Sequence, residues 1–68
     1  MTLDCRGILC PLPVIKLAQA LPNVEVGDTI TVLADDPAAA TDIPAWCRMR
    51  SQELVSATDS QYVVRRVS

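Results

Sequence analysis

The chain reads Thr29-Ile30-Thr31-Val32-Leu33-Ala34-Asp35-Asp36-Pro37 at its centre. The first six residues are rich in β-branched side chains and alternate along the chain, which is typical of a β-strand buried on one face. The side chains on the buried face are expected to be Ile30, Val32 and Ala34. The acidic pair that follows can cap a helix, and proline suits the first helical position. This stretch therefore predicts a strand that leads directly into a helix.

The helix predicted after this strand covers residues 38–51. The residues that share one of its stripes are Ala39, Ile43, Trp46, Cys47 and Arg50. Pro44 interrupts the pattern, because a proline inside a helix removes a hydrogen bond and clashes with the preceding turn, which costs about 3 kcal/mol. The sequence leaves two alternatives open: a kink at Pro44, or a second helical start capped by Asp42.

The segments on either side complete the set of elements. Residues 2–5 predict a short strand that ends at Gly7, with Leu3 and Cys5 facing inward. Residues 11–21 predict a helix with Lys16 and Gln19 facing outward and with the inward positions Val14, Leu17, Ala18 and Leu21. Residues 53–57 and 61–67 predict two strands that residues 58–60 join into an antiparallel hairpin.

This order, βαβαββ, predicts an α+β fold: a two-layer α/β sandwich with a mixed sheet of about four strands and two helices on one face. We expect a single domain over residues 1–68. The other face of the sheet would stay open. Its apolar residues, Leu33 with one set from Val55, Val63 and Val67, form either an apolar strip that invites a partner or the scattered surface residues normal for a small domain.

The composition limits the kinds of binding and catalysis that are open to this chain. The chain has 68 residues, a net charge of −2 and no histidine. The acidic balance argues against direct binding to nucleic acid or to an anionic membrane, and the lack of histidine excludes Cys-His and Ser-His-Asp catalysis. We expect a cytoplasmic protein, since no stretch is long and apolar enough to span a bilayer and residues 2–6 do not resemble a secretory leader. Three cysteines without a Cys-x-x-Cys pair predict free thiols, with no structural metal site.

Cys10 is the strongest candidate for a reactive group. It precedes Pro11 and Pro13, which places it at the predicted N-cap of the helix over residues 11–21. At that position the helix dipole and the N–H of Leu12 would favour a thiolate, so Cys10 is a candidate nucleophile. The alternative is that Cys10 is a small apolar residue that seals the junction between strand and helix.

The other candidate side chains have simpler interpretations. Cys5 and Cys47 are expected to pack in the core, although a Cys5–Cys10 disulfide is sterically conceivable. The pair Asp35 and Asp36 is expected to cap the second helix rather than to act as a catalytic or metal-binding pair. Four arginines form either a local basic patch or ordinary solvated charge: Arg48, Arg50, Arg65 and Arg66.

Several motifs occur together in an order and at a spacing that resemble the TusA/SirA family of small sulfur-carrier proteins. They are Leu3-Asp4, Gly7, Cys10-Pro11-x-Pro13, Ala34-Asp35-Asp36-Pro37-Ala38 and Asp42-Ile43-Pro44-x-x-Cys47. The resemblance extends over about residues 2–67 and implies a two-layer βαβαββ sandwich, in agreement with the order derived from periodicity.

The resemblance also implies a function. Cys10 would accept sulfane sulfur as a persulfide from a cysteine desulfurase or another persulfide donor, and would pass it to a downstream sulfur-acceptor protein. Pro11 and Pro13 match the positions that shape the loop of this cysteine. Such a sulfurtransferase needs no cofactor, metal or general base, because a thiolate that attacks a persulfide expels another thiolate. Arg6 would add positive potential near Cys10.

The resemblance defines the sulfur-transfer pathway less closely than the reaction itself. In TusA proper the relay leads to 2-thiolation of the tRNA wobble uridine, whereas relatives serve sulfur oxidation or molybdenum-cofactor synthesis. Leu12 stands where several relatives carry a charged residue, which weakens any inference about the docking partner. Transient docking to larger enzymes favours a monomer. Two other classes stay open: a non-catalytic interaction module, and a thiol redox protein with Cys5 as the resolving cysteine.

Overall fold

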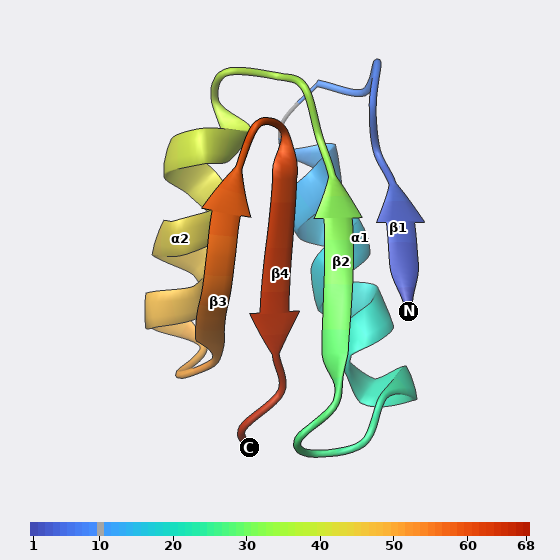
Figure 1. Ribbon diagram of the computed structural model, residues 1–68, viewed down its shortest axis with the longest axis vertical. Helices are drawn as coiled ribbons and strands as arrows, with labels where there is room; N and C mark the ends of the chain where they lie inside the picture. The colour runs from blue at the N-terminus through green and yellow to red at the C-terminus, as the bar shows by residue number, and fades with distance from the viewer. Residues whose placement is uncertain (10) are drawn as a thin grey trace.

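The computed structural model describes residues 1–9 and 11–68 (Figure 1). In chain order its elements are β1 (Thr2–Asp4), α1 (Leu12–Ala20), the 3₁₀ helix η1 (Leu21–Asn23), β2 (Thr29–Leu33), α2 (Ala39–Met49), β3 (Glu53–Thr58) and β4 (Gln61–Arg65). The predicted order βαβαββ is confirmed. The short helix η1 follows α1 where Pro22 lacks the N–H that a further α-helical bond would need.

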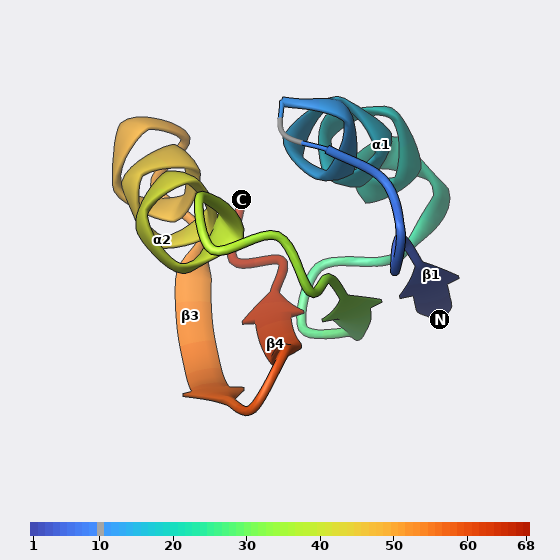
Figure 2. The ribbon, with the colours of Figure 1, turned by 90° about the horizontal axis from the view of Figure 1, so that it is seen from above.

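The strands form one mixed sheet in the order β1-β2-β4-β3. β1 is parallel to β2, whereas β4 pairs antiparallel with both β2 and β3. Figure 2 shows α1 and α2 next to each other over the same face of this sheet. The predicted two-layer α+β sandwich is therefore confirmed.

The hydrophobic core lies between the sheet and the two helices. On the sheet side it contains the predicted inward positions Ile30, Val32 and Ala34, and Leu17 of α1 and Ile43 of α2 are fully buried against them. Burying a side chain of this size contributes about 1.5–3 kcal/mol. These contacts hold both helices on the sheet and so fix the ends of the loops that precede them.

Helix α1 begins one residue later than predicted. Pro11, with φ −92° and ψ 12°, is the N-cap, and its carbonyl accepts the first α-helical bond from the N–H of Ile15 at 3.0 Å. The prediction that Cys10 is the N-cap is therefore wrong, because Cys10 precedes the cap by one position in the chain. Pro13 is buried in the first turn, where a missing N–H leaves no intrahelical bond unmade.

Helix α2 also begins later than predicted. The backbone N–H groups of residues 39–41 donate to carbonyls three positions back, so a tight turn precedes the first α-helical bond, from the N–H of Asp42 to the carbonyl of Ala38 (2.9 Å). α2 is a single helix that contains Pro44, so the alternative of a second helical start at Asp42 is wrong. No helix in residues 1–9 and 11–68 is both long enough and apolar enough to cross a membrane.

β3 and β4 form the predicted hairpin. Its two turn residues, Asp59 and Ser60, have φ values of 39° and 66°, a combination that matches the twist of the flanking strands. β4 ends at Arg65, earlier than predicted, because the next residues bond elsewhere: the N–H of Arg66 donates to the carbonyl of Asp28 (2.9 Å), and that of Val67 to the side chain of Gln52.

The open face of the sheet is mixed in polarity. Leu33 and Val63 lie half-buried on this face, and Val63 is paired with Thr31 in the register of β2 and β4. Close by on the same face, Arg65 forms a salt bridge with Glu53 at 3.0 Å. Of the two alternatives for this face, the arrangement favours scattered apolar residues over a continuous apolar strip.

Candidate functional site

Cys10, the predicted nucleophile, lies outside the described residues, and the segments on either side of it define the candidate site. Leu9, directly before it, is 73% exposed. The N–H of Leu12, which was predicted to serve the Cys10 sulfur, donates to the carbonyl of Leu9 at 3.1 Å. A backbone hydrogen bond thus links Leu9 and Leu12, which lie on either side of Cys10 in the sequence.

The loop from Cys5 to Leu9 leads from β1 to this turn. It is tied to β2 by the N–H of Cys5, which donates to the carbonyl of Leu33 at 2.7 Å. Its middle is tied to the loop between β2 and α2, because the N–H of Gly7 donates to Oδ1 of Asp35 at 2.9 Å. Since β1 and β2 are parallel, both loops leave the same end of the sheet, at the top of Figure 1.

Asp35 and Asp36 therefore have different roles. Oδ1 of Asp36 accepts a hydrogen bond from the N–H of Ala38 at 3.0 Å, in the turn before α2, but the N-cap of α2 is Ala38, so the prediction that Asp36 caps the helix itself is wrong. The capping prediction is wrong for Asp35 as well, because its carboxylate accepts the N–H of Gly7, 28 residues away in the chain.

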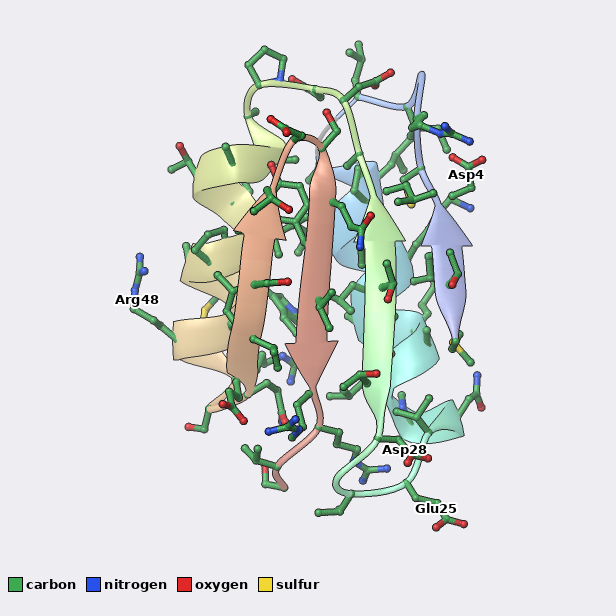
Figure 3. The ribbon with its side chains drawn as sticks, viewed as in Figure 1. Asp4, Glu25, Asp28 and Arg48 are labelled. Carbon is green, nitrogen blue, oxygen red and sulfur yellow. The ribbon has the colours of Figure 1, made fainter. Side chains whose placement is uncertain are left out.

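The charge of Arg6 is offset by a neighbouring carboxylate. Its Nε and Nη2 donate to Oδ1 and Oδ2 of Asp4 at 3.0 and 2.9 Å, a two-pronged pair at the end of β1 (Figure 3). The side-chain hydrogen bonds from Arg6 lower the pKa of Asp4 to about 2. Arg6 is thus paired with Asp4, and its predicted contribution to the potential near Cys10 stays a prediction, because Cys10 lies outside the described residues.

The other two cysteines are core residues. Cys5 and Cys47 are free thiols that are 0% and 2% exposed, as predicted for packing residues. The conceivable Cys5–Cys10 disulfide is therefore not formed. Burial raises the pKa of both thiols, because a thiolate loses its solvation in the core. A buried, protonated Cys5 is a poor resolving cysteine, which disfavours the thiol redox alternative.

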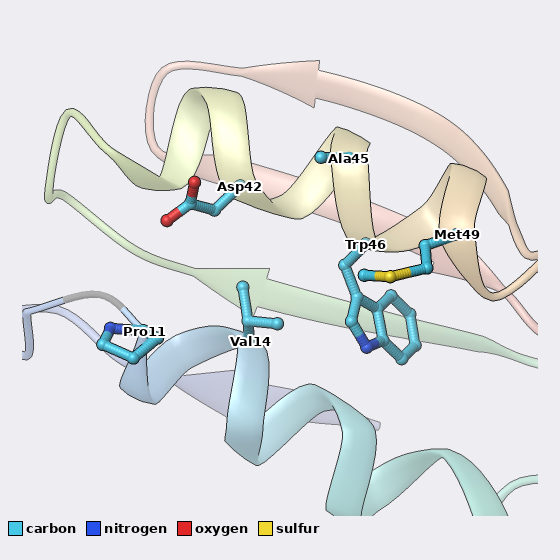
Figure 4. A pocket seen from close by; sticks show the side chains of 6 residues that line it. All are labelled: Pro11, Val14, Asp42, Ala45, Trp46 and Met49. Carbon is cyan, nitrogen blue, oxygen red and sulfur yellow. The ribbon is translucent and has the colours of Figure 1, made fainter.

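A groove runs between the two helices and begins at Pro11, the residue that follows Cys10. It has a volume of about 230 Å³ and is lined by Pro11 and Val14 of the α1 side and by Asp42, Ala45, Trp46 and Met49 of α2 (Figure 4). Asp42 lies at the end near Pro11, and the indole of Trp46 and the thioether of Met49 lie towards the other end. The groove can accept an apolar side chain or segment next to the residue that follows Cys10.

This groove was not predicted from the sequence. Trp46 was assigned to the buried stripe of α2, which is correct, but Met49 is 76% exposed and Asp42 is half-buried beside it on the neighbouring surface of the helix. The small side chains of Val14 and Ala45 leave the space between the helices open. A groove of this kind depends on how two helices pack, and the spacing of apolar residues in each helix separately carries no signal of it.

The four arginines serve different segments. Arg65 pairs with Glu53, and Nη1 of Arg66 donates to the carbonyl of Val24 at 2.6 Å. The guanidinium of Arg50 lies over the ring of Trp46 at 5.9 Å from its centroid, while Arg48 extends from the outer side of α2 (Figure 3). The arrangement favours ordinary surface charge over a common basic patch.

The described residues form a small α+β domain in which the loops after β1 and β2 meet at one end of a mixed sheet. The structure is similar to the crystal structure of a SirA-like protein from Desulfitobacterium hafniense, with a TM-score of 0.70 and 27% sequence identity over 93% of this chain and 89% of that chain. The family model for sulfurtransferase TusA matches residues 1–66. The chain therefore belongs to the TusA family of sulfurtransferases, as the resemblance of its motifs implied.

Proposed function

We propose that this protein is a sulfur carrier that holds sulfane sulfur as a persulfide on Cys10. The observation that carries the proposal is the match to the sulfurtransferase family over residues 1–66, a range that contains Cys10-Pro11-x-Pro13. The burial of Cys5 and Cys47 supports the choice of cysteine, because neither thiol can meet a second protein without unfolding.

The chemistry requires one exchange at each end of the relay. The Cys10 thiolate attacks the outer sulfur of a donor persulfide, a new S–S bond forms on Cys10, the donor S–S bond breaks, and the donor cysteine leaves as a thiolate. The same exchange in reverse order delivers the sulfur to an acceptor thiol. No net oxidation occurs and no base is needed, which suits a chain without histidine.

The two prolines of the motif shape the approach to Cys10. Pro11 fixes the backbone at the N-cap of α1, and Pro13, two residues later in the first turn, is fully buried. Between them Leu12 is 48% exposed, and Ile15, 44% exposed, follows it on α1. These apolar side chains and the groove beside Pro11 form a surface on which a larger donor or acceptor protein can dock.

We assign the donor to the cysteine desulfurases, or to another enzyme that carries a persulfide, and the acceptor to a downstream sulfur-acceptor protein. The pathway that we propose first is 2-thiolation of the tRNA wobble uridine in the cytoplasm, with sulfur oxidation or molybdenum-cofactor synthesis as alternatives. The carrier acts as a monomer and binds no nucleic acid itself, which is in keeping with its net charge of −2.

The proposal is tested by intact mass spectrometry after incubation with a cysteine desulfurase, pyridoxal phosphate and cysteine. The wild type is expected to gain one sulfur atom that a reductant removes, Cys10→Ser is expected to gain none, and Cys47→Ala serves as the matched control that still gains it. A wild type that gains no sulfur from a desulfurase or from a rhodanese persulfide, or a Cys10→Ser variant that does, would contradict the proposal.

The groove also favours a second candidate, a non-catalytic interaction module. In that case the partner would bind through Trp46, Met49 and their neighbours without any need for the thiol. Cys10→Ser would then retain the biological role of the protein, whereas Met49→Asp would abolish it. A role that disappears in Cys10→Ser while the variant stays folded excludes the module.

A further inference from the structure

The loop that leads to Cys10 is held by a side chain from a distant part of the chain. Oδ1 of Asp35 accepts the N–H of Gly7 at 2.9 Å, across 28 residues of sequence. Asp35 directly follows the buried Ala34, whose N–H bonds to the carbonyl of Ser60 at 2.9 Å. The sheet therefore fixes the position of the Asp35 carboxylate, and this carboxylate restrains the loop before Cys10.

Side-chain packing does not hold the loop at Gly7. Gly7 has φ +79°, and a Cβ placed there would meet no atom within 4 Å. Of the residues around it, Arg6 and Leu9 are exposed, whereas Ile8 is partly buried against the core. Backbone bonds fix the ends: the N–H of Cys5 bonds to Leu33, and the N–H of Ile8 bonds back to Cys5 at 3.2 Å. At Gly7 itself, where no side chain can pack, the bond to Asp35 ties the backbone of the loop to the rest of the domain.

Helix capping does not account for Asp35. The N–H of Ala38 in the turn that opens α2 is served by Asp36, at 3.0 Å. The contact that explains the position of Asp35 is its hydrogen bond to Gly7, in the loop of residues 5–9 that leads to Cys10. We propose that Asp35 is a positioning residue for sulfur transfer, one that holds the loop before Cys10 in the orientation that a protein-bound persulfide requires. This inference rests on the proposed sulfur-carrier function.

Thiol exchange between two proteins makes strong demands on orientation. The attacking sulfur must approach along the donor S–S bond while both protein surfaces stay docked, and a misplacement of about 1 Å can lower such a rate by about a hundredfold. A small alkylating reagent approaches from any open direction and makes no such demand. Loss of a positioning contact should therefore slow transfer from a protein donor and leave alkylation of Cys10 almost unchanged.

The test compares Asp35→Ala, which removes the acceptor, with Asp35→Asn, which keeps an oxygen acceptor without the charge. Asp28→Ala is the matched control for loss of an exposed carboxylate, since Asp28 lies at the opposite end of the sheet (Figure 3). For each protein, the initial rate of sulfur gain on Cys10 is measured against desulfurase concentration. The rate of Cys10 alkylation by iodoacetamide is measured in parallel, with circular dichroism to establish that each variant is folded.

We expect Asp35→Ala to lower the maximal rate of sulfur gain about tenfold, and Asp35→Asn and Asp28→Ala to stay within about twofold of the wild type. Alkylation should stay within about twofold in every variant. The inference is overturned by normal transfer in Asp35→Ala, by an Asp35→Asn variant as slow as Asp35→Ala, or by an equal fall in alkylation. A wild type that gains no sulfur at all would refute the proposed function instead, so the two failures are distinct.

Discussion

Leu17→Ala should remove a large part of the stability of the domain. Leu17 is 0% exposed and joins α1 to the core under the sheet. Truncating a fully buried leucine to alanine costs about 3–5 kcal/mol, through the lost burial and the cavity left behind. A globular chain of 68 residues has a total stability of roughly 3–10 kcal/mol, so the variant is expected to be marginally folded or unfolded at 25 °C.

Urea unfolding followed by the fluorescence of Trp46 measures this loss, because Trp46 is the single tryptophan and is only 4% exposed. Leu12→Ala is the matched control: it removes the same atoms from the same helix at a position that is 48% exposed, and should cost about 1 kcal/mol or less. The account of the core is refuted if Leu17→Ala loses less than about 1 kcal/mol, or no more than Leu12→Ala.

Two further predictions concern ionisation. Burial raises the pKa of Cys5 and Cys47 from the ordinary value of 9.0, so the stability that these protonated thiols contribute should be complete below about pH 9 and decline at higher pH. Urea unfolding measured from pH 7 to 10.5 tests this decline, which Cys47→Ala should flatten. A midpoint of wild-type unfolding that does not change with pH would contradict the prediction. Because Arg6 lowers the pKa of Asp4 to about 2, the carboxyl chemical shift of Asp4 should titrate near pH 2 in the wild type and near 3.8 in Arg6→Ala, and equal midpoints would show that the pair does not persist in solution.

Periodicity predicted the elements whose residues face a core. The alternation in residues 29–34 placed Ile30, Val32 and Ala34 on the buried face, where the structure has them. The order of strands and helices then allowed few topologies, since right-handed crossovers place both helices on one face of the sheet. The alternation of apolar and polar residues is a local feature of the sequence, so the buried face of each element could be predicted.

The ends of the helices were less predictable. The sequence places Cys10 and Asp36 as caps, whereas the first α-helical bonds begin at Pro11 and Ala38. A shift of one or two residues depends on whether a carbonyl bonds three or four positions ahead, and these alternatives differ little in energy. The identity of the candidate nucleophile was nevertheless available, because it depends on the Cys-Pro-x-Pro motif and not on the exact start of the helix.

Contacts between distant segments could not be predicted at all. The hydrogen bond from Gly7 to Asp35 joins two loops that meet because β1 and β2 are parallel neighbours. The groove between α1 and α2 likewise depends on packing, and its residues Asp42 and Met49 show no distinctive spacing. Both features lie at the predicted site, and both required the tertiary structure.

The central claim is that sulfur resides on Cys10, and peptide mapping tests it most directly. Trypsin separates the three cysteines, because cleavage after Arg6, Lys16 and Arg48 leaves Cys5 in residues 1–6, Cys10 in residues 7–16 and Cys47 in residues 17–48. The wild type is incubated with a cysteine desulfurase and cysteine, alkylated to cap the persulfide, and digested. One additional sulfur in the peptide of residues 7–16 and in neither of the others is the predicted result. Sulfur on the peptide of Cys5 or Cys47, or on none of the three, would contradict the account.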